Sequence, residues 1–355
     1  MHSLLDPPES ICLLRMSALG DVTHVVPVIR TLQKYWPEVR ISWIIGVREH
    51  RLLSALPGIE FIVFDKRGGW RAVNRLRRAL QGRRFDFLLH MQLSTRANLL
   101  SSLVRARVRL GWDRPRSREF HHWFINAAVR RVPFQHQVQA FLEFPRALGL
   151  EVAEPCWNLP ISEAARAWAC STIDTTRRTL VISPCSSHAA RNWRAEHYSA
   201  VADFASSELG MQVVLSGGPG QQEREMGANI ESKMQQRCLN LVGQDTLEQS
   251  MALFRQADLL LSPDSGPVHI ASALGTDVLG LYAATWSRRS GPYNSLDLCV
   301  DRFGEAARRF RNKAPEQLRW GSRIEAPGVM DLIHPGDVIQ RLARWHERSS
   351  PKSAS

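Results

Sequence analysis

Short apolar runs alternate with longer segments of helical periodicity along this chain of 355 residues, and the alternation occurs twice. Such alternation predicts parallel β-α-β units, because a parallel strand needs a long connection, which is usually a helix. The first series predicts strands at 11–16, 41–47, 61–65, 85–91 and 108–112, with helices at 22–36, 48–56, 95–104 and 135–148 and a basic helix that ends near 80. The second series predicts strands at 179–183, 212–216, 239–242, 259–261 and 277–282, with helices at 195–209, 221–235, 246–256 and 335–346. The stretch 285–332 is predicted to be irregular.

Two series of this length predict two α/β domains of Rossmann type, facing each other across a cleft. We expect an N-terminal domain over 1–165, a C-terminal domain over 166–333, and a closing helix with a loose tail over 334–355. Open parallel sheets bind ligands beyond the carboxyl ends of their strands, and clefts between domains are favoured ligand sites.

One strand-to-helix turn, in the stretch 257–275, has the composition of a phosphate site. The apolar run Leu259–Leu261 is followed by Asp264 and Ser265, whose oxygens can cap a helix, and then by Gly266, which permits close backbone approach. His269 falls in the first helical turn, where free N–H groups favour an anion. The alternative is an ordinary turn in which Asp264 is only a cap.

The composition is that of a soluble globular protein, with 44% hydrophobic and 23% charged residues. The six cysteines are scattered, and we find neither a secretory signal nor a long apolar run, so we expect a cytoplasmic protein with reduced thiols. A net charge of +12 favours an anionic partner. Without a nucleic-acid motif, a phosphate-bearing lipid or sugar is preferred over nucleic acid, and a solvated basic surface is the alternative.

Four motifs, in order along the chain, resemble those of the bacterial lipopolysaccharide heptosyltransferases of glycosyltransferase family nine. They are Arg15–His24 with Pro27, Ser183–Ser187 with Arg191–Trp193, Ser216–Pro219, and Ser262–Gly266 with His269. Where Arg191 stands, this family usually has lysine, and 286–333 matches the family poorly.

The resemblance implies a GT-B fold and an inverting, metal-independent transfer of L-glycero-D-manno-heptose from ADP-heptose to the inner core of lipopolysaccharide. The C-terminal half would hold the donor and the N-terminal half the acceptor, with no cofactor. The absence of an Asp-x-Asp pair agrees with metal independence. The expected location is cytoplasmic, with peripheral contact at the anionic inner face of the inner membrane.

Two residues are the predicted catalytic groups. Asp21 follows a glycine turn after the first strand and is the candidate base for the acceptor hydroxyl, although the same side chain could cap the next helix. Arg191 is the candidate cation for the leaving diphosphate, and its alternative is a surface arginine.

The remaining site predictions divide between the two ligands. For the donor they are Ser186, Ser187, Gly217, Glu223, Thr246, Asp264, Ser265, Gly266 and His269. For the acceptor they are Ser17, Gly20, Thr23, His24, Arg67, Arg71 and Arg118, the arginines standing in two basic clusters at 67–78 and 114–122. His24 could equally pack inside a helix.

Two other functions stay open on the sequence. One is a GT-B enzyme with a different nucleotide sugar, including an epimerase that needs no acceptor. The other is a nucleotide-sugar binding module without catalysis.

Overall fold

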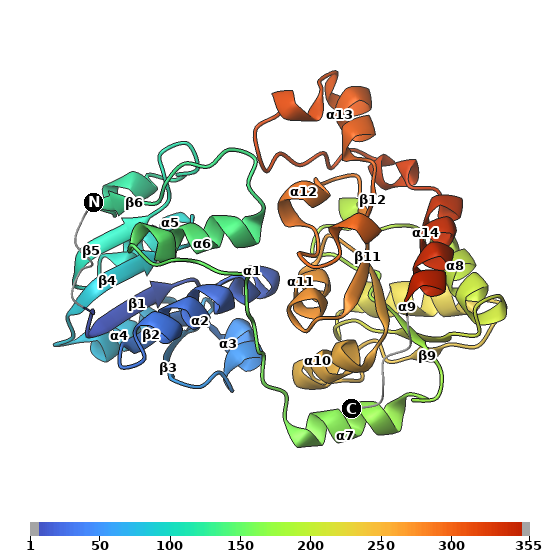
Figure 1. Cartoon of the computed structure of the whole chain (residues 1–355), viewed down its shortest axis with the longest axis horizontal. Coiled ribbons are helices and arrows are strands. Elements are labelled where there is room, and N and C mark those ends of the chain that lie inside the picture. The colour runs from blue at the N-terminus through green and yellow to red at the C-terminus, as the bar shows by residue number, and fades with distance from the viewer. Residues whose placement is uncertain (1–6, 350–355) are drawn as a thin grey trace. The chain divides into compact units, whose positions relative to one another are not determined.

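The computed structural model describes residues 7–349, which form two compact units that divide between Pro160 and Ile161 (Figure 1). Each unit contains a six-stranded sheet whose strands are all parallel, so the predicted α/β class is confirmed. No helix in the described range is both long and apolar enough to cross a membrane.

The sheet of unit 1 has the order β3-β2-β1-β4-β5-β6. Its strands are β1 (Ser10–Leu14), β2 (Arg40–Gly46), β3 (Ile59–Phe64), β4 (Phe85–His90), β5 (Ala106–Gly111) and β6 (Ala127–Ala128). The chain builds outward from β1 to β3 and then restarts on the other side of β1 with β4. The strand order therefore reverses between β1 and β4, which is where such sheets bind ligands.

Helices cover both faces of this sheet, as in other doubly wound folds. They are α1 (Leu19–Thr23), α2 (Val26–Tyr35), α3 (Val47–Leu53), α4 (Gly69–Leu80), α5 (Thr95–Ser101) and α6 (Gln137–Ala147). The apolar sides of α4 and α5 share one core with β1 to β4, with Leu76, Leu88 and Leu100 at its centre. The starts of α4 and α5 therefore lie at the same edge of the sheet as the ends of β3 and β4.

The sheet of unit 2 has the order β12-β11-β10-β7-β8-β9, which repeats the order of unit 1 strand for strand. Its strands are β7 (Thr179–Ile182), β8 (Gln212–Leu215), β9 (Leu239–Asn240), β10 (Leu259–Pro263), β11 (Asp277–Tyr282) and β12 (Val300–Asp301). Here the strand order reverses between β7 and β10.

The helices of unit 2 enclose a separate core. The longer ones are α7 (Glu163–Thr172), α8 (Ala195–Ser207), α9 (Gln221–Lys233), α10 (Leu247–Gln256), α11 (Gly266–Ala273), α13 (Phe303–Arg311) and α14 (Pro335–Arg348). Leu342 and Trp345 of α14 pack in the same core as β7 and β11, so the closing helix is part of unit 2.

The structure differs from the sequence-based expectations at three places. The single helix predicted over 22–36 is two helices, α1 and α2, because the chain turns at His24 and Val25. Strands β6 and β12 were not predicted, since two residues are too few for a periodic signal. The stretch 285–332 contains α13, whose buried residues are only Phe303, Ala306 and Ala307, and whose last turn carries three arginines, so its apolar face is short.

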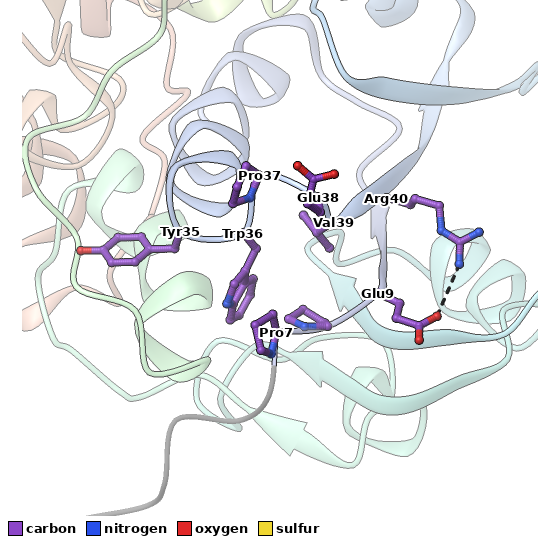
Figure 2. A pocket seen from close by; sticks show the side chains of 9 residues that line it. Pro7, Glu9, Tyr35, Trp36, Pro37, Glu38, Val39 and Arg40 are labelled. Atoms are coloured by element: carbon purple, nitrogen blue, oxygen red, sulfur yellow. Dashed lines mark ion pairs between the residues drawn. The ribbon is translucent and has the colours of Figure 1, made fainter.

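A hollow of about 490 Å³ lies at the amino ends of β1 and β2 (Figure 2). The rings of Tyr35 and Trp36 line it, together with three prolines, and an ion pair between Glu9 and Arg40 stands at one side. Parallel strands direct their carboxyl ends to the opposite edge, so none of the predicted site residues lines this hollow.

Candidate functional site

In unit 2 the two loops that leave β7 and β10 are held side by side at the strand-order reversal. The amide of Ser183 donates to the carbonyl of Leu261 at 3.0 Å, and Ser262 Oγ donates to the carbonyl of Ser183 at 2.8 Å. Ser262 also exchanges a hydrogen bond of 2.9 Å with Ser265. The second and fourth sequence motifs therefore meet, as the topology of a parallel sheet requires.

Arg191, in the loop after β7, is a buried cation at the carboxyl-end edge of the unit 2 sheet. Only 8% of its side chain is exposed. Its Nη1 lies 3.5 Å from Asp264 Oδ2, and its Nη2 lies 2.9 Å from Glu325 Oε1. A buried charge needs partners of this kind. The surface-arginine alternative is wrong, because Arg191 stands at the strand ends between two carboxylates.

Glu325 was not anticipated from the sequence. It lies in the irregular segment 322–326, and the buried Ile324 fixes that segment by donating its amide to the carbonyl of Ala284, just after β11, at 2.8 Å. Burial raises the pKa of the Glu325 carboxyl, but the hydrogen bond and the charge of Arg191 outweigh burial and leave the pKa below its ordinary value. Arg191 and Glu325 are 134 residues apart, and no local pattern links them.

Asp264 is turned toward charged neighbours. Ser265 is the N-cap residue of α11, and its side chain makes no capping bond. Asp264 faces Arg191 and also His269 Nε2, which lies 3.9 Å from Asp264 Oδ1. The turn Ser265–Gly266 and the start of α11 thus adjoin the Arg191–Asp264 pair, an arrangement of cation, helix terminus and imidazole suited to an anion.

The other predicted donor residues have structural partners of their own. Asn192 Oδ1 accepts from the amide of Ser186 at 2.7 Å and shapes the loop before Arg191, in which Ser187 is exposed. Glu223 accepts from the amide of Gly218 at 3.0 Å, next to Gly217, and so holds the turn after β8. Thr246 is the N-cap of α10 and accepts from the amide of Gln249 at 3.3 Å. Contact of these residues with a donor stays a prediction.

In unit 1, Asp21 lies in α1 beside the strand-order reversal at the end of β1. Arg15 Nη2 lies 2.5 Å from Asp21 Oδ2, and Gln137 Nε2 donates to Asp21 Oδ1. Asp21 Oδ2 also accepts from the amide of Ala18 at 3.1 Å, so the carboxylate does support the start of α1. The side chain is 28% exposed and stays open to solvent on one side.

The residues around Asp21 differ in accessibility. Ser17 is partly exposed, and Gln92, which follows β4, donates to its hydroxyl at 3.1 Å. Thr23 is buried and donates to the carbonyl of Gly20 at 2.6 Å. His24 is 2% exposed and packs against the ring of Phe141, which agrees with the packed-histidine alternative. The sequence reasoning missed Gln92 and Gln137, although Gln92 follows the strand next to β1.

The two basic clusters follow β3 and β5, so each begins at the carboxyl-end edge of the unit 1 sheet, and the first continues into α4. Arg67 and Arg71 are exposed at the start of α4, as is Arg118 in the later loop. Three aromatic side chains are also unusually exposed there, namely Trp70 at 72%, Phe120 at 60% and Trp123 at 71%. Phe120 and Trp123 stack on each other with ring centroids 4.7 Å apart.

A buried polar cluster supports the second of these loops. Asn98 Oδ1 accepts from His90 Nε2 at 2.9 Å and from His121 Nδ1 at 3.0 Å. His121 Nε2 accepts from the amide of Trp112 at 3.1 Å. Burial lowers the pKa of His121 to about 4, and burial, with repulsion from His121 when that ring is protonated, lowers the pKa of His90. His121, which belongs to the second basic cluster of the sequence, is therefore a neutral interior residue.

Solved structures define the class of protein to which this fold belongs. A glycosyl transferase of family 9 from Veillonella parvula matches with a TM-score of 0.78 and 20% identity over 96% of this chain and 98% of that one. ADP-heptose lipopolysaccharide heptosyltransferase II of Escherichia coli matches with a TM-score of 0.71 and 21% identity over 96% and 99% of the two chains. The chain has two α/β units, each with a parallel sheet, and its backbone matches these structures over nearly its whole length. Its fold is therefore GT-B.

Sequence comparison gives the family. The model of glycosyltransferase family 9 (heptosyltransferase) matches residues 73–318. The lipopolysaccharide core heptosyltransferase OpsX of Haemophilus influenzae is 37% identical over 344 residues, which are 97% of this chain and 99% of that protein. The chain therefore belongs to glycosyltransferase family 9, and it is a glycosyltransferase enzyme.

Proposed function

We propose that this enzyme transfers L-glycero-D-manno-heptose from ADP-heptose to the inner core of lipopolysaccharide, with inversion and without a metal ion. Its family and its 37% identity to a lipopolysaccharide core heptosyltransferase over nearly the whole chain support the substrate class. The observation that carries the proposal is Arg191, buried beside Asp264 and the start of α11 where the strand order of unit 2 reverses. That is a site for a diphosphate.

The proposed mechanism is a single displacement. Asp21 accepts the proton of the acceptor hydroxyl while the hydroxyl oxygen attacks the anomeric carbon of the heptose. The bond from that carbon to the β-phosphate oxygen breaks, and ADP leaves with the electron pair. Arg191 and the amides at the start of α11 stabilise the charge that develops on the diphosphate. Attack from the face opposite the leaving group inverts the anomeric centre.

A direct assay of donor and acceptor tests the proposal. The protein is incubated with ADP-heptose, and in parallel with other nucleotide sugars, over truncated core acceptors, and the products are weighed by mass spectrometry. We expect a gain of one heptose on the acceptor, only from ADP-heptose. Transfer of a different sugar would replace the donor assignment, and a product formed without acceptor would identify an epimerase. Donor binding with no turnover on any core acceptor would indicate a binding module.

The basic edge of unit 1 supports an acceptor that carries phosphate and lies in a membrane. Arg67, Arg71 and Arg118 are exposed there, as are the stacked rings of Phe120 and Trp123. Arginine binds phosphate groups, and tryptophan is favoured at the interface between lipid and water. We therefore place the acceptor phosphates, and peripheral contact with the anionic inner face of the inner membrane, at this edge.

A further inference from the structure

One edge of the Arg191 guanidinium is already paired with a carboxylate. Its Nε and Nη2 lie 3.2 Å and 2.9 Å from the same oxygen, Oε1 of Glu325. These two nitrogens form one edge of the planar fork, which binds carboxylates and phosphates through parallel hydrogen bonds. Glu325 therefore occupies an edge through which Arg191 can bind a diphosphate.

The local charge also opposes a diphosphate while Glu325 stays in place. Two carboxylates, Asp264 and Glu325, share this guanidinium, while the charge of Arg323 also acts on Glu325 and two imidazoles lie nearby. Those imidazoles are His188, whose Nδ1 is 3.9 Å from Glu325, and His269, whose Nε2 is 3.9 Å from Asp264. A diphosphate placed against Glu325 meets like charge at close range, which is costly away from bulk water.

The two carboxylates differ in how firmly they are held. Asp264 is 12% exposed and stands in the short turn between β10 and α11. Glu325 is 34% exposed and stands in a segment without regular structure, in which the neighbouring Ile324 provides the buried anchor. Of the two, Glu325 is the partner that can turn into solvent without unfolding an element.

We propose that Glu325 pairs with Arg191 while the donor site is empty. When the nucleotide sugar binds, its diphosphate displaces Glu325 from Arg191. This inference rests on the proposed function, in which unit 2 binds that diphosphate. Glu325 acts through Arg191 and is a positioning residue. It keeps a buried guanidinium paired and oriented before the donor arrives, and it competes for Arg191 again when the nucleoside diphosphate leaves.

Competition between Glu325 and the diphosphate for Arg191 should weaken the binding of ADP. A site that must first lose an internal partner binds its ligand more weakly than a site already free, in proportion to the fraction that is free. Replacing Glu325 with glutamine keeps the size of the side chain and removes the charge. We expect Glu325→Gln to bind ADP more tightly, lowering Kd by about three- to tenfold, because glutamine loses the charge but keeps part of the hydrogen bonding to Arg191.

Asp331→Asn is the matched control. Asp331 lies six positions further along the chain and makes an ion pair of 2.5 Å with Arg194, which is 62% exposed. This substitution removes a carboxylate close by in the sequence, and its partner is Arg194 instead of Arg191. We expect no change in Kd for ADP. Calorimetric titration of the full chain with ADP and with inorganic pyrophosphate measures both variants, and melting curves show that they are folded.

The outcomes separate this inference from the proposed donor. Tighter binding of ADP by Glu325→Gln alone supports the inference, and unchanged or weaker binding overturns it. If pyrophosphate binds and shows the same tightening but ADP does not bind, the inference holds and the adenine nucleotide assignment fails. If neither ligand binds any variant, the diphosphate site is absent from unit 2, and the inference and the proposed donor site both fail.

Discussion

Asp21 has a structural role in addition to its proposed chemical one. Its carboxylate accepts from Ala18 and Gln137 and pairs with Arg15, and these contacts orient it at the end of β1. A base must be held in position to be effective, so the ordering role and the catalytic role are compatible.

Asp21→Asn separates the two roles. Asparagine keeps the hydrogen bonds that a carbonyl oxygen can accept but cannot take a proton from the acceptor. We expect kcat to fall by about 10²–10⁴-fold, as for loss of a general base, with the Kd for ADP unchanged. Asp86→Asn is the control, because Asp86 accepts from the amides of Glu9 and Ser10 at the amino-end edge of the same sheet. If both variants lose activity only as far as they lose stability, Asp21 is a cap and not the base.

The residues of the site were foreseeable to different degrees. Asp21, Arg191 and Asp264 follow strands and stand in motifs, so chain order and residue type were enough to select them. Gln92 is positioned by the pairing of β1 with β4, which a local pattern does not reveal. Glu325 could not be predicted from the sequence, because its position depends on the hydrogen bond between the amide of Ile324 and the backbone after β11.

At the scale of elements, a residue predicted to bind the donor can also have a structural role at the start of a helix. Thr246 begins α10 in a capping box, in which its hydroxyl accepts from Gln249 and the Gln249 side chain accepts from the amide of Thr246 at 2.8 Å. The sequence could not separate the two roles, because a cap and a donor contact use the same side-chain oxygen.

Thr246→Ala decides the role of this residue. We expect the free energy of unfolding to fall by about 1 kcal/mol, the usual cost of removing a threonine cap. If Thr246 acts only as a cap, the donor KM stays at the wild-type value, measured by steady-state transfer. Ser94→Ala is a matched control, since Ser94 caps α5 by accepting from Ala97 at 3.3 Å. A rise in donor KM for Thr246→Ala alone would support the predicted contact of Thr246 with the donor.

The buried histidines that support the loop after β5 give unit 1 a pH dependence. Burial lowers the pKa of His121 to about 4, and the pKa of His90 is lowered too. In the unfolded chain a histidine titrates near its ordinary value of about 6.5, so between these values the unfolded state binds more protons. This contribution to stability is therefore present at neutral pH and is lost as the pH falls from about 6.5 toward 4.

Thermal unfolding at pH 7, 6, 5 and 4.5 tests this dependence. We expect the Tm to fall with pH, and we expect His121→Gln, which cannot be protonated, to show a shallower fall although it is less stable at pH 7. Equal pH slopes in the variant and the wild type would show that other groups control acid unfolding.

At the scale of the whole molecule, alternating strands and helices were sufficient to predict two parallel sheets. The edge strands β6 and β12 were missed because their position depends on pairing with β5 and β11 and not on their own residues. The net charge of +12 was also evident from composition, but the position of the basic segments after β3 and β5 at one edge of the sheet depends on how the strands are arranged.

The exposed arginines at the carboxyl-end edge of the unit 1 sheet predict that charge contributes to acceptor binding. We expect the double substitution Arg67→Glu and Arg71→Glu to raise the acceptor KM by at least about tenfold, because each arginine-to-phosphate contact is charge-assisted. The Kd for ADP should not change. Arg77→Glu with Arg78→Glu, in the last turn of the same helix α4, keeps the net charge equal and serves as the control. Equal effects of the two pairs, or none, would remove the Arg67 loop from the acceptor site.

The repeated strand order gives each unit its own hydrophobic core and its own strand-order reversal. On the proposed function, each substrate is thus recognised by a body that folds around a different set of side chains. Acceptor preference and nucleotide preference can then diverge independently during evolution. A chimera that exchanges residues 7–160 should inherit the acceptor range of its new half and keep the sugar nucleotide of the old one.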